Sequence, residues 1–386
     1  MTEFLENMKT MCEQVLRDSA LENGAMIAAN GIFLPPTAAP YHFVWGRDAA
    51  KHLLAAHSLR MEDAPGIRKR FLEWTVRCVP GDDNSRLFIK RNHLNGPNDF
   101  LYNDDHGFQP DNNGALLSAI DTTRTNPDDP LGDKTMRLLA NGLAAKWDLD
   151  KRGFSMRQQD LWENDTIDPE ENNFFTHALL VAAHGLSCAV ATLNGNVPDN
   201  ELELWQLTSQ QMYDRVYTAV ESNTNNWFSK RLYATKSNPV TLDAGIVLAV
   251  PELLPSNAPE SIRIIAAQTV RKVGEKLLAL PYGAYRYKGD TYDGIERTDG
   301  SEATAGAWPL LGYAWTRAAK KVGMIDEAAI ALSRMDSHLE KLYLTGTIPK
   351  YRVPEQIHPD GDNRNGLGPM HFAWGSAEWV LAHTDL

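Results

Sequence analysis

Two kinds of helical segment alternate along this chain, and that alternation restricts its fold more than any other feature. Apolar residues recur at helical spacing through most of the sequence and predict about twelve helices. The expected helices, with ends good to about 2–4 residues, cover residues 3–22, 48–61, 66–79, 113–122, 131–147, 174–193, 199–220, 242–250, 258–279, 303–321, 326–342 and 370–383. Strand signals are few, at Leu87-Phe88-Ile89 and Arg231-Leu232-Tyr233, where we expect local hairpins. The chain is therefore expected to be all-α.

The loops between these segments indicate which helices are buried. Loops rich in Trp, Tyr, Asp, Glu, Arg or Gly recur every ~60–70 residues, a period longer than that of the usual solenoids. They cover residues 41–47, 108–113, 160–173, 238–242, 285–301 and 351–369. The helix after such a loop tends to be small and apolar all round, as in residues 243–250, whereas the intervening helices, such as 261–280, are amphipathic.

A helix that is apolar all round is buried, and a helix with a polar stripe faces water. Buried and exposed helices in strict alternation describe an (α/α)6 toroid, or six-hairpin barrel, whose inner helices present their loops at one end. Such a toroid lets one core run the length of the chain, beyond the usual limit of about 250–300 residues. A helical solenoid and two separate bundles are the competing architectures.

The bulk composition limits the classes of partner. The chain has 386 residues, 43% of them hydrophobic, with no linker-like or low-complexity tract, so we expect residues 1–386 to form a single domain. The net charge, 38 − 50 = −12, opposes nonspecific binding to nucleic acid and to anionic membranes. Cys12, Cys78 and Cys188 lack metal or CxxC spacing, which indicates a reducing compartment.

The N-terminal segment has no signal-peptide pattern, and no apolar run is expected to reach membrane-spanning length. We therefore expect a cytoplasmic protein without nucleic-acid or membrane partners. A monomer and a small homo-oligomer are both compatible with the sequence.

Two segments far apart in the chain place a carboxylate beside aromatic or polar partners. They are Asp160-Leu161-Trp162-Glu163 and Pro354-Glu355-Gln356, and a third polar segment, Trp45-Gly46-Arg47-Asp48, lies near the start. One carboxylic acid and one carboxylate across a pocket are the minimal equipment for hydrolysing a glycosidic bond. Trp and an Arg–Asp pair are side chains that hold a sugar ring. These residues predict a glycosidase.

Six segments, in order, resemble glycoside hydrolase family 15, which includes glucoamylases and glucodextranases. The matching segments are Trp45-x-Arg47-Asp48-Ala49, Gln109-x-Asp111-x-x-Gly114, Asp160-Leu161-Trp162-Glu163 with Phe174-Phe175-Thr176, Arg286-Tyr287-x-x-Asp290-Thr291-Tyr292, Trp308-Pro309-Leu310 and Pro354-Glu355-Gln356. The resemblance covers about residues 40–380 and implies the toroid fold and a catalytic domain that needs no metal or organic cofactor.

The resemblance implies that Glu163 is the general acid and Glu355 the general base of an inverting reaction. A general acid must keep its proton near neutral pH, which burial or a neighbouring negative charge can achieve. In inverting enzymes the two carboxyl groups lie about 6.5–9.5 Å apart, with room for the attacking water. The plain alternatives are a helix cap near Asn173 for Glu163 and a solvent-facing loop for Glu355.

The same resemblance implies a substrate-binding set. Arg47 and Asp48 would clamp hydroxyls of the terminal glucose, Arg286 would contact sugar on both sides of the scissile bond, and Gln356 would position the base or the water. The remaining candidates, which would line the pocket, are Tyr41, Trp45, Asp111, Leu161, Trp162, Asn164 and Trp308. The alternatives are a helix N-cap for Asp48, a surface ion pair for Arg286 and plain core packing for the aromatic residues.

Two departures from the family pattern leave the linkage open. Many relatives have a second acid directly after the catalytic Glu, where this chain has Asn164, and the following segment, 165–172, is longer and more acidic than in fungal glucoamylases. The chain also shows no β-sandwich or starch-binding module. We therefore expect an exo-acting α-glucosidase that releases β-glucose from small oligosaccharides, with malto-oligosaccharides, isomalto-oligosaccharides and trehalose all possible substrates. A trehalase, a sugar phosphorylase, an uronide hydrolase or a non-catalytic sugar-binding protein are the alternatives.

Overall fold

The structure is a closed double ring of helices. The computed structural model describes residues 2–29, 43–88, 91–92, 94, 108–163, 165–222, 226–233, 241–250, 258–290, 292, 305–348, 352–358 and 372–384. Within these residues the inner ring consists of α2 (Gly46–Ser58), α4 (Asp111–Thr122), α6 (Thr176–Leu193), the 3₁₀ helix η6 (Ala244–Leu248), α10 (Pro309–Lys321) and α12 (Ala373–His383). Each of these elements contacts the next, and α12 contacts α2, so the ring is closed.

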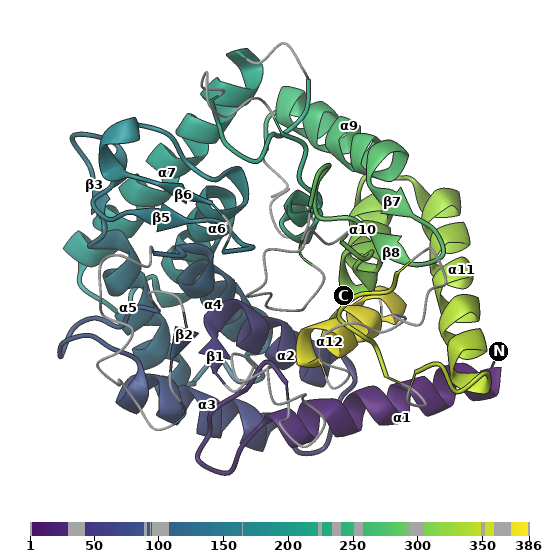
Figure 1. Ribbon diagram of the computed structural model, residues 1–386. Coiled ribbons are helices and arrows are strands. Elements are labelled where there is room, and N and C mark those ends of the chain that lie inside the picture. The colour runs from purple at the N-terminus through teal and green to yellow at the C-terminus, as the bar shows by residue number, and fades with distance from the viewer. Residues whose placement is uncertain are drawn as a thin grey trace, which may run out of the picture.

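An outer ring surrounds the inner one (Figure 1). In the described part of the chain it consists of α1 (Thr2–Ser19), α3 (Ala64–Cys78), α5 (Pro130–Ala144), α7 (Asp199–Ser222), α9 (Glu260–Lys276) and α11 (Ile325–Leu344). The N-terminal helix α1 packs on the C-terminal helix α12. The predicted all-α, (α/α)6 toroid is confirmed.

Burial separates the two rings as the apolar patterns predict. Every residue of α2 from Gly46 to Ala56 is buried, polar ones included. The outer helix α1 instead buries one stripe, which includes Phe4, Met8, Cys12 and Leu16. An inner helix is covered on all sides by its neighbours, whereas an outer helix keeps a polar face in water.

Two predicted helices differ from the structure. The helix expected at 303–321 begins at Pro309, because proline suits the first position of a helix and pushes the residue before it towards extended backbone. Ala307 and Trp308 are accordingly extended and form isolated bridges with Ile357 and Ala284. In the segment expected at 242–250, the structure has the short 3₁₀ helix η6.

The strands are short antiparallel pairs that lie at loops. They are β1 (Val44–Trp45) with β2 (Arg91–Asn92), β3 (Trp147–Asp148) with β4 (Gly153–Phe154), β5 (Gln158–Gln159) with β6 (Thr166–Ile167), and β7 (Leu278–Ala279) with β8 (Gly283–Ala284); a 3₁₀ turn, η5 (Pro169–Glu171), follows β6.

The predicted hairpins near residues 87 and 231 are wrong within the described residues. The amide of Leu87 donates to the carbonyl of Pro80 and that of Phe88 to the Asn113 side chain, so neither amide is available to a strand partner. Arg231 forms one isolated bridge, with Phe175.

The helix α6 corrects one expectation. By length and composition it is apolar enough to cross a membrane, although no such run was expected. In the fold 67% of the helix is buried, and α6 packs against α4 and α7. Buried core helices of water-soluble proteins can be equally long and apolar, so this property does not indicate a membrane span.

Isolated β-bridges tie together the segments that precede the inner helices. Phe108 pairs with Gln158, Phe175 with Arg231, Asp243 with Tyr287, and Phe372 with Ala29, one bridge before each of α4, α6, η6 and α12. The first turns of the inner helices consequently gather at one end of the ring, which we call the mouth. This placement explains why the loop residues of the sequence motifs can meet.

Backbone contact between α4 and α6 closes one side of the inner ring. A Cβ atom added to Gly185 would lie 2.4 Å from the carbonyl oxygen of Gly114, and one added to Gly114 would lie 2.4 Å from that of Val181. Neither distance is compatible with a side chain. The Gly114 of the sequence motif therefore has a packing role.

We expect Gly185→Ala to destabilise the fold by about 1–3 kcal/mol, because the two helices must separate to admit the methyl group. A thermal unfolding midpoint measured by circular dichroism checks this. Gly66→Ala in α3 is the control, since its Cβ would lie 3.5 Å from the nearest atom, in the flexible Arg70 side chain. The control should stabilise the helix by roughly 0.5–1 kcal/mol. An unchanged midpoint for Gly185→Ala would contradict the backbone contact.

Candidate active site

Glu163 lies in the tip of the hairpin formed by β5 and β6. The loop is closed at its base: the Asp160 amide donates to the Asp165 carbonyl at 2.9 Å, and the Asp165 amide donates to Asp160 Oδ1 at 3.0 Å. Lys230 Nζ lies 2.8 Å from Asp160 Oδ2 and 3.7 Å from Asp165 Oδ2. Lys230 thereby neutralises the carboxylates of Asp160 and Asp165, and the Asp160 carboxylate points towards Lys230.

The backbone of Glu163 has a left-handed conformation, with φ 63°. This conformation costs an ordinary L-residue roughly 1–2 kcal/mol. It is fixed by two hydrogen bonds, from the Glu163 amide to the Asp160 carbonyl at 3.1 Å and from Gln159 Nε2 to the Glu163 carbonyl at 3.0 Å. Strained backbone that the surroundings enforce is common at functional sites.

The Glu163 carboxylate is directed at the inner ring. Trp45 Nε1 donates to its Oε1 at 3.1 Å, and Trp45 is the residue that precedes α2. The helix-cap alternative for Glu163 is wrong, because α6 begins after Phe175 and has no side-chain cap.

Arg47 and Asp48 lie in the first turn of α2. Arg47 Nη1 donates to Asp111 Oδ2 at 2.7 Å, and Arg47 Nε lies 3.8 Å from Asp48 Oδ2. Asp111, the first residue of α4, is fully buried, so it orients Arg47 from behind. The N-cap position of α2 is occupied by Trp45, which excludes that role for Asp48.

Negative neighbours and burial act together on Asp48. The pKa of its carboxyl group is raised to about 6, mainly by burial and in addition by the charges of Glu163 and Asp111, while Arg47 lowers it. The charge of Glu163 at the hairpin tip therefore acts on Asp48 in the first turn of α2.

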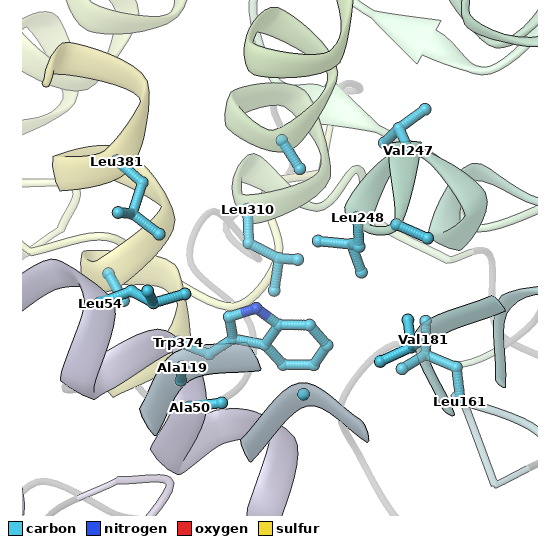
Figure 2. Packing of buried hydrophobic residues seen from close by; sticks show 14 of the residues in the cluster. Ala50, Leu54, Ala119, Leu161, Val181, Val247, Leu248, Leu310, Trp374 and Leu381 are labelled. Atoms are coloured by element: carbon cyan, nitrogen blue, oxygen red, sulfur yellow. The ribbon is translucent and has the colours of Figure 1, made fainter. Parts of the chain in front are cut away.

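Trp374 forms the floor beneath Arg47. The guanidinium carbon of Arg47 lies 5.0 Å from the centre of the Trp374 ring, a cation–π contact. Figure 2 shows this indole in the middle of the inner ring, among Leu54, Leu310 and Leu248. Below it, the buried Glu378 binds Arg317 at 2.8 Å and Lys51 at 3.5 Å.

Arg286 is enclosed by aromatic rings. Its guanidinium carbon lies 4.8–5.6 Å from the ring centres of four aromatic residues, Trp162, Tyr287, Tyr292 and Trp308. Its Nε donates to Asp290 Oδ2 at 2.6 Å, and its Nη2 donates to the other Asp290 oxygen. Arg286 is 2% exposed, so the alternative of a surface ion pair is wrong and the pair is a buried one.

The segment with Glu355 joins the mouth beside Trp308. Ile357 pairs with Ala307, and the Gly306 amide donates to Gln356 Oε1 at 2.9 Å. Trp308 in turn lies 5.5 Å from Trp162, centre to centre. Glu355 is 2% exposed, which excludes a solvent-facing loop residue. The Glu163 hairpin therefore contacts the Trp308 ring through Trp162, and the Glu355 segment pairs with the residues directly before Trp308.

Most predicted site residues belong to this mouth. The structure connects Trp45, Arg47, Asp48, Asp111 and Glu163 by hydrogen bonds and charge on one side, and Trp162, Arg286, Trp308 and Gln356 on the other. Leu161 is buried beside Gly245 at the hairpin tip. Tyr41 and Asn164 lie outside the described residues.

Sequence reasoning gave no site role to four residues of the mouth, His177, Asp243, Trp374 and Tyr292, of which only Tyr292 lies in a matching segment. His177 Nδ1 lies 4.0 Å from Asp111 Oδ2, and Asp243 accepts from Trp162. Three of the four lie in the first turn of an inner helix or directly before one. Their place at the start of an inner helix is the sequence feature that could have identified these three residues. Among the described residues no group of three or more His, Cys, Asp or Glu side chains could hold a metal ion.

Comparisons with known proteins find the same fold. A glycosidase in its wild-type form is 18% identical over 97% of this chain and 95% of that chain, with a TM-score of 0.67. A variant of a glycosidase in complex with glucose gives a TM-score of 0.68 at 18% identity and the same coverage. A glucoamylase from Saccharomycopsis fibuligera gives 0.66 at 14% identity, over 99% of this chain and 94% of that one.

A bacterial glucoamylase complexed with acarbose has a TM-score of 0.67 at 16% identity, over 97% of this chain and 55% of that chain. No protein-family model matches the chain, and no curated protein matches it in sequence. The structural likenesses establish the (α/α)6 fold.

We expect Glu163→Gln to lower the pKa of Asp48 from about 6, because it removes one of the negative charges that raise it. A carbon-13 NMR titration of the Asp48 carboxyl group measures the change. Glu327→Gln, at an exposed position in the first turn of α11, is the matched control and should leave the titration unaltered. An Asp48 pKa that stays the same in Glu163→Gln would show that the two carboxyl groups are not neighbours.

Proposed function

We propose that this protein is a glycoside hydrolase, and more finely an inverting, exo-acting α-glucosidase of the glycoside hydrolase family 15 type. The observation that carries the proposal is Glu163, held in a strained left-handed conformation beside the buried Arg47–Asp48 pair at the mouth of the toroid. The fold shared with proteins described as glycosidase and glucoamylase, among them complexes with glucose and with acarbose, supports it.

In the proposed reaction Glu163 donates a proton to the glycosidic oxygen as the bond to the anomeric carbon breaks. Glu355 accepts a proton from a water that attacks that carbon from the opposite face, so the configuration is inverted and β-glucose leaves. The indole N–H of Trp45 orients the Glu163 carboxyl group. Water is the nucleophile, and the reaction requires no metal or organic cofactor.

The residues around Trp374 support the exo mode. Arg47, Asp48 and the Trp374 ring beneath them offer a charged donor, a charged acceptor and an aromatic face to one terminal sugar. Further along α12, the buried Glu378 forms ion pairs with Arg317 and Lys51 inside the inner ring. The Trp374 floor suits a short oligosaccharide that enters by its non-reducing end.

Polar atoms on the other side of the mouth fit sugar binding as well. Within the described residues, Trp308 Nε1 and Gln356 Nε2 are buried donors that have no hydrogen-bond partner in the protein. Buried donors are nearly always satisfied in native proteins, and a bound sugar or its attacking water would satisfy these two.

Glu163→Gln and Glu355→Gln should each lower turnover by about 10²–10⁴-fold, because each removes a proton-transfer group and keeps its shape. The assay measures glucose release from maltose, isomaltose and trehalose, with and without inorganic phosphate, and NMR identifies the first anomer formed. Glu327→Gln is the control and should retain full turnover. Circular dichroism verifies folding.

Near-normal turnover in both variants would remove the assignment of acid and base. α-Glucose released first from the non-reducing unit of maltose or isomaltose would contradict inversion, and a requirement for phosphate would indicate a phosphorylase. Sugar binding without any product from the wild-type protein would indicate a non-catalytic role.

A further inference from the structure

Asp243 lies between the hairpin that includes Glu163 and the loop that includes Arg286. It is buried directly before η6, and its Oδ1 accepts the Gly245 amide at 2.7 Å. Both of its oxygens lie 3.0 Å from Trp162 Nε1, so the indole N–H is shared between them. Its backbone pairs with Tyr287, and the Ala244 amide donates to the Arg286 carbonyl at 2.7 Å. One residue therefore contacts both the hairpin and the Arg286 loop.

The hairpin tip rests on the turn that Asp243 begins. A Cβ atom on Gly245 would lie 2.6 Å from Leu161 Cδ2 and 3.1 Å from Trp162 Cζ2, so glycine alone lets the tip approach this closely. The Trp162 ring then lies 5.5 Å from the Trp308 ring and 5.3 Å from the Arg286 guanidinium carbon. The position of the indole is fixed from three directions.

The buried carboxylate of Asp243 does more than accept the indole N–H of Trp162. Burial penalises a carboxylate, and one amide oxygen would already satisfy an indole N–H. The charge of Asp243 also acts on the cations Lys230 and Arg286, and it is opposed by Asp160. Lys230 binds the base of the hairpin and Arg286 packs on its tip. The carboxylate thus attracts the cations on both sides of the acid hairpin.

We propose that Asp243 is a positioning residue that holds Glu163, through Trp162, in the orientation required for proton donation. Trp162 immediately precedes Glu163, so a rotation of the indole is transmitted to the strained Glu163 backbone. The proposal rests on the proposed function, since it assigns Asp243 a part in that reaction. Asp243 does not itself touch the substrate.

A double-mutant cycle tests the route through Trp162. Asp243→Asn removes the charge, Trp162→Phe keeps an aromatic ring and removes the N–H, and the third variant combines both. We expect each single variant to lower kcat by roughly 10–100-fold, since a small misplacement of a catalytic group has that effect. Because both act on one contact, the combined variant should be no worse than about the poorer single variant.

Effects that multiply in the combined variant, or a kcat for Asp243→Asn within twofold of wild type, would overturn the proposal. Asp199→Asn, at an exposed position in the first turn of α7, is the control. If Asp243→Asn does not fold, Trp162→Phe carries the test, because it leaves the carboxylate in place: a kcat lowered by the stated factor supports the proposal and a normal kcat overturns it.

A second measurement does not depend on activity. Burial raises the pKa of Asp243 to about 6, so protonation of its carboxylate as the pH falls should shift the NMR resonance of the Trp162 indole N–H with that midpoint. The resonance is assigned by its loss in Trp162→Phe. Lys230, Arg286 and Asp160 are the charged groups that face Asp243. The shift should disappear in Asp243→Asn.

The two measurements separate the two proposals. If the indole resonance titrates but the protein has no glycosidase activity, the proposed function is wrong and the Asp243–Trp162 contact is still supported. An active enzyme whose indole resonance is the same in Asp243→Asn, with kcat unchanged, would overturn the positioning role alone.

Discussion

Close packing of helix backbones around one axis is the constraint on which the rest of this structure depends. Gly114 and Gly185 bring α4 and α6 into direct backbone contact, and the bridges at Phe108, Phe175 and Asp243 tie the segments that precede α4, α6 and η6 to neighbouring loops. Side chains at these helix starts have no route outwards to water, because the outer ring covers the inner helices. The polar side chains at these helix starts therefore contact one another at the mouth, and these contacts determine their charge and orientation.

Several buried charges in this arrangement are paired with opposite charges. Arg47 is paired with Asp111, Asp160 with Lys230, Arg286 with Asp290, and Glu378 with Arg317 and Lys51. An unpaired charge in such a place would be strongly destabilising, so each pair also fixes the orientation of its members. Asp48 shares Arg47 with Asp111, and the negative charge of Glu163 lies beside it. The proposed hydrolysis uses this excess of acidic groups beside the Trp374 ring.

Some of this organisation could be predicted from the sequence. The 3.6-residue apolar period marked the helices, and the difference between helices apolar all round, such as α6, and striped ones, such as α1, gave the two rings. Pro309, whose ring favours the first helical position, could have corrected the start of α10. The packing of the hairpin tip on Gly245 in η6 could not be predicted, because Leu161 and Trp162 are distant from Gly245 in sequence. The roles of Asp243 and Trp374 were missed because neither lies within a motif, and their partners are distant in sequence.

The sequence by itself determined the all-α class, the inner and outer helices and the residue types that gather in the loops, because periodicity and loop composition are local properties. Tertiary structure alone decided which of those residues face one another. It turned the Asp160 carboxylate to Lys230 and the Glu163 carboxylate to Trp45, although the two acids are close neighbours in one hairpin. Local hydrogen bonds within the hairpin fix the left-handed backbone of Glu163, whereas the partners of the two carboxylates, Lys230 and Trp45, come from distant parts of the chain.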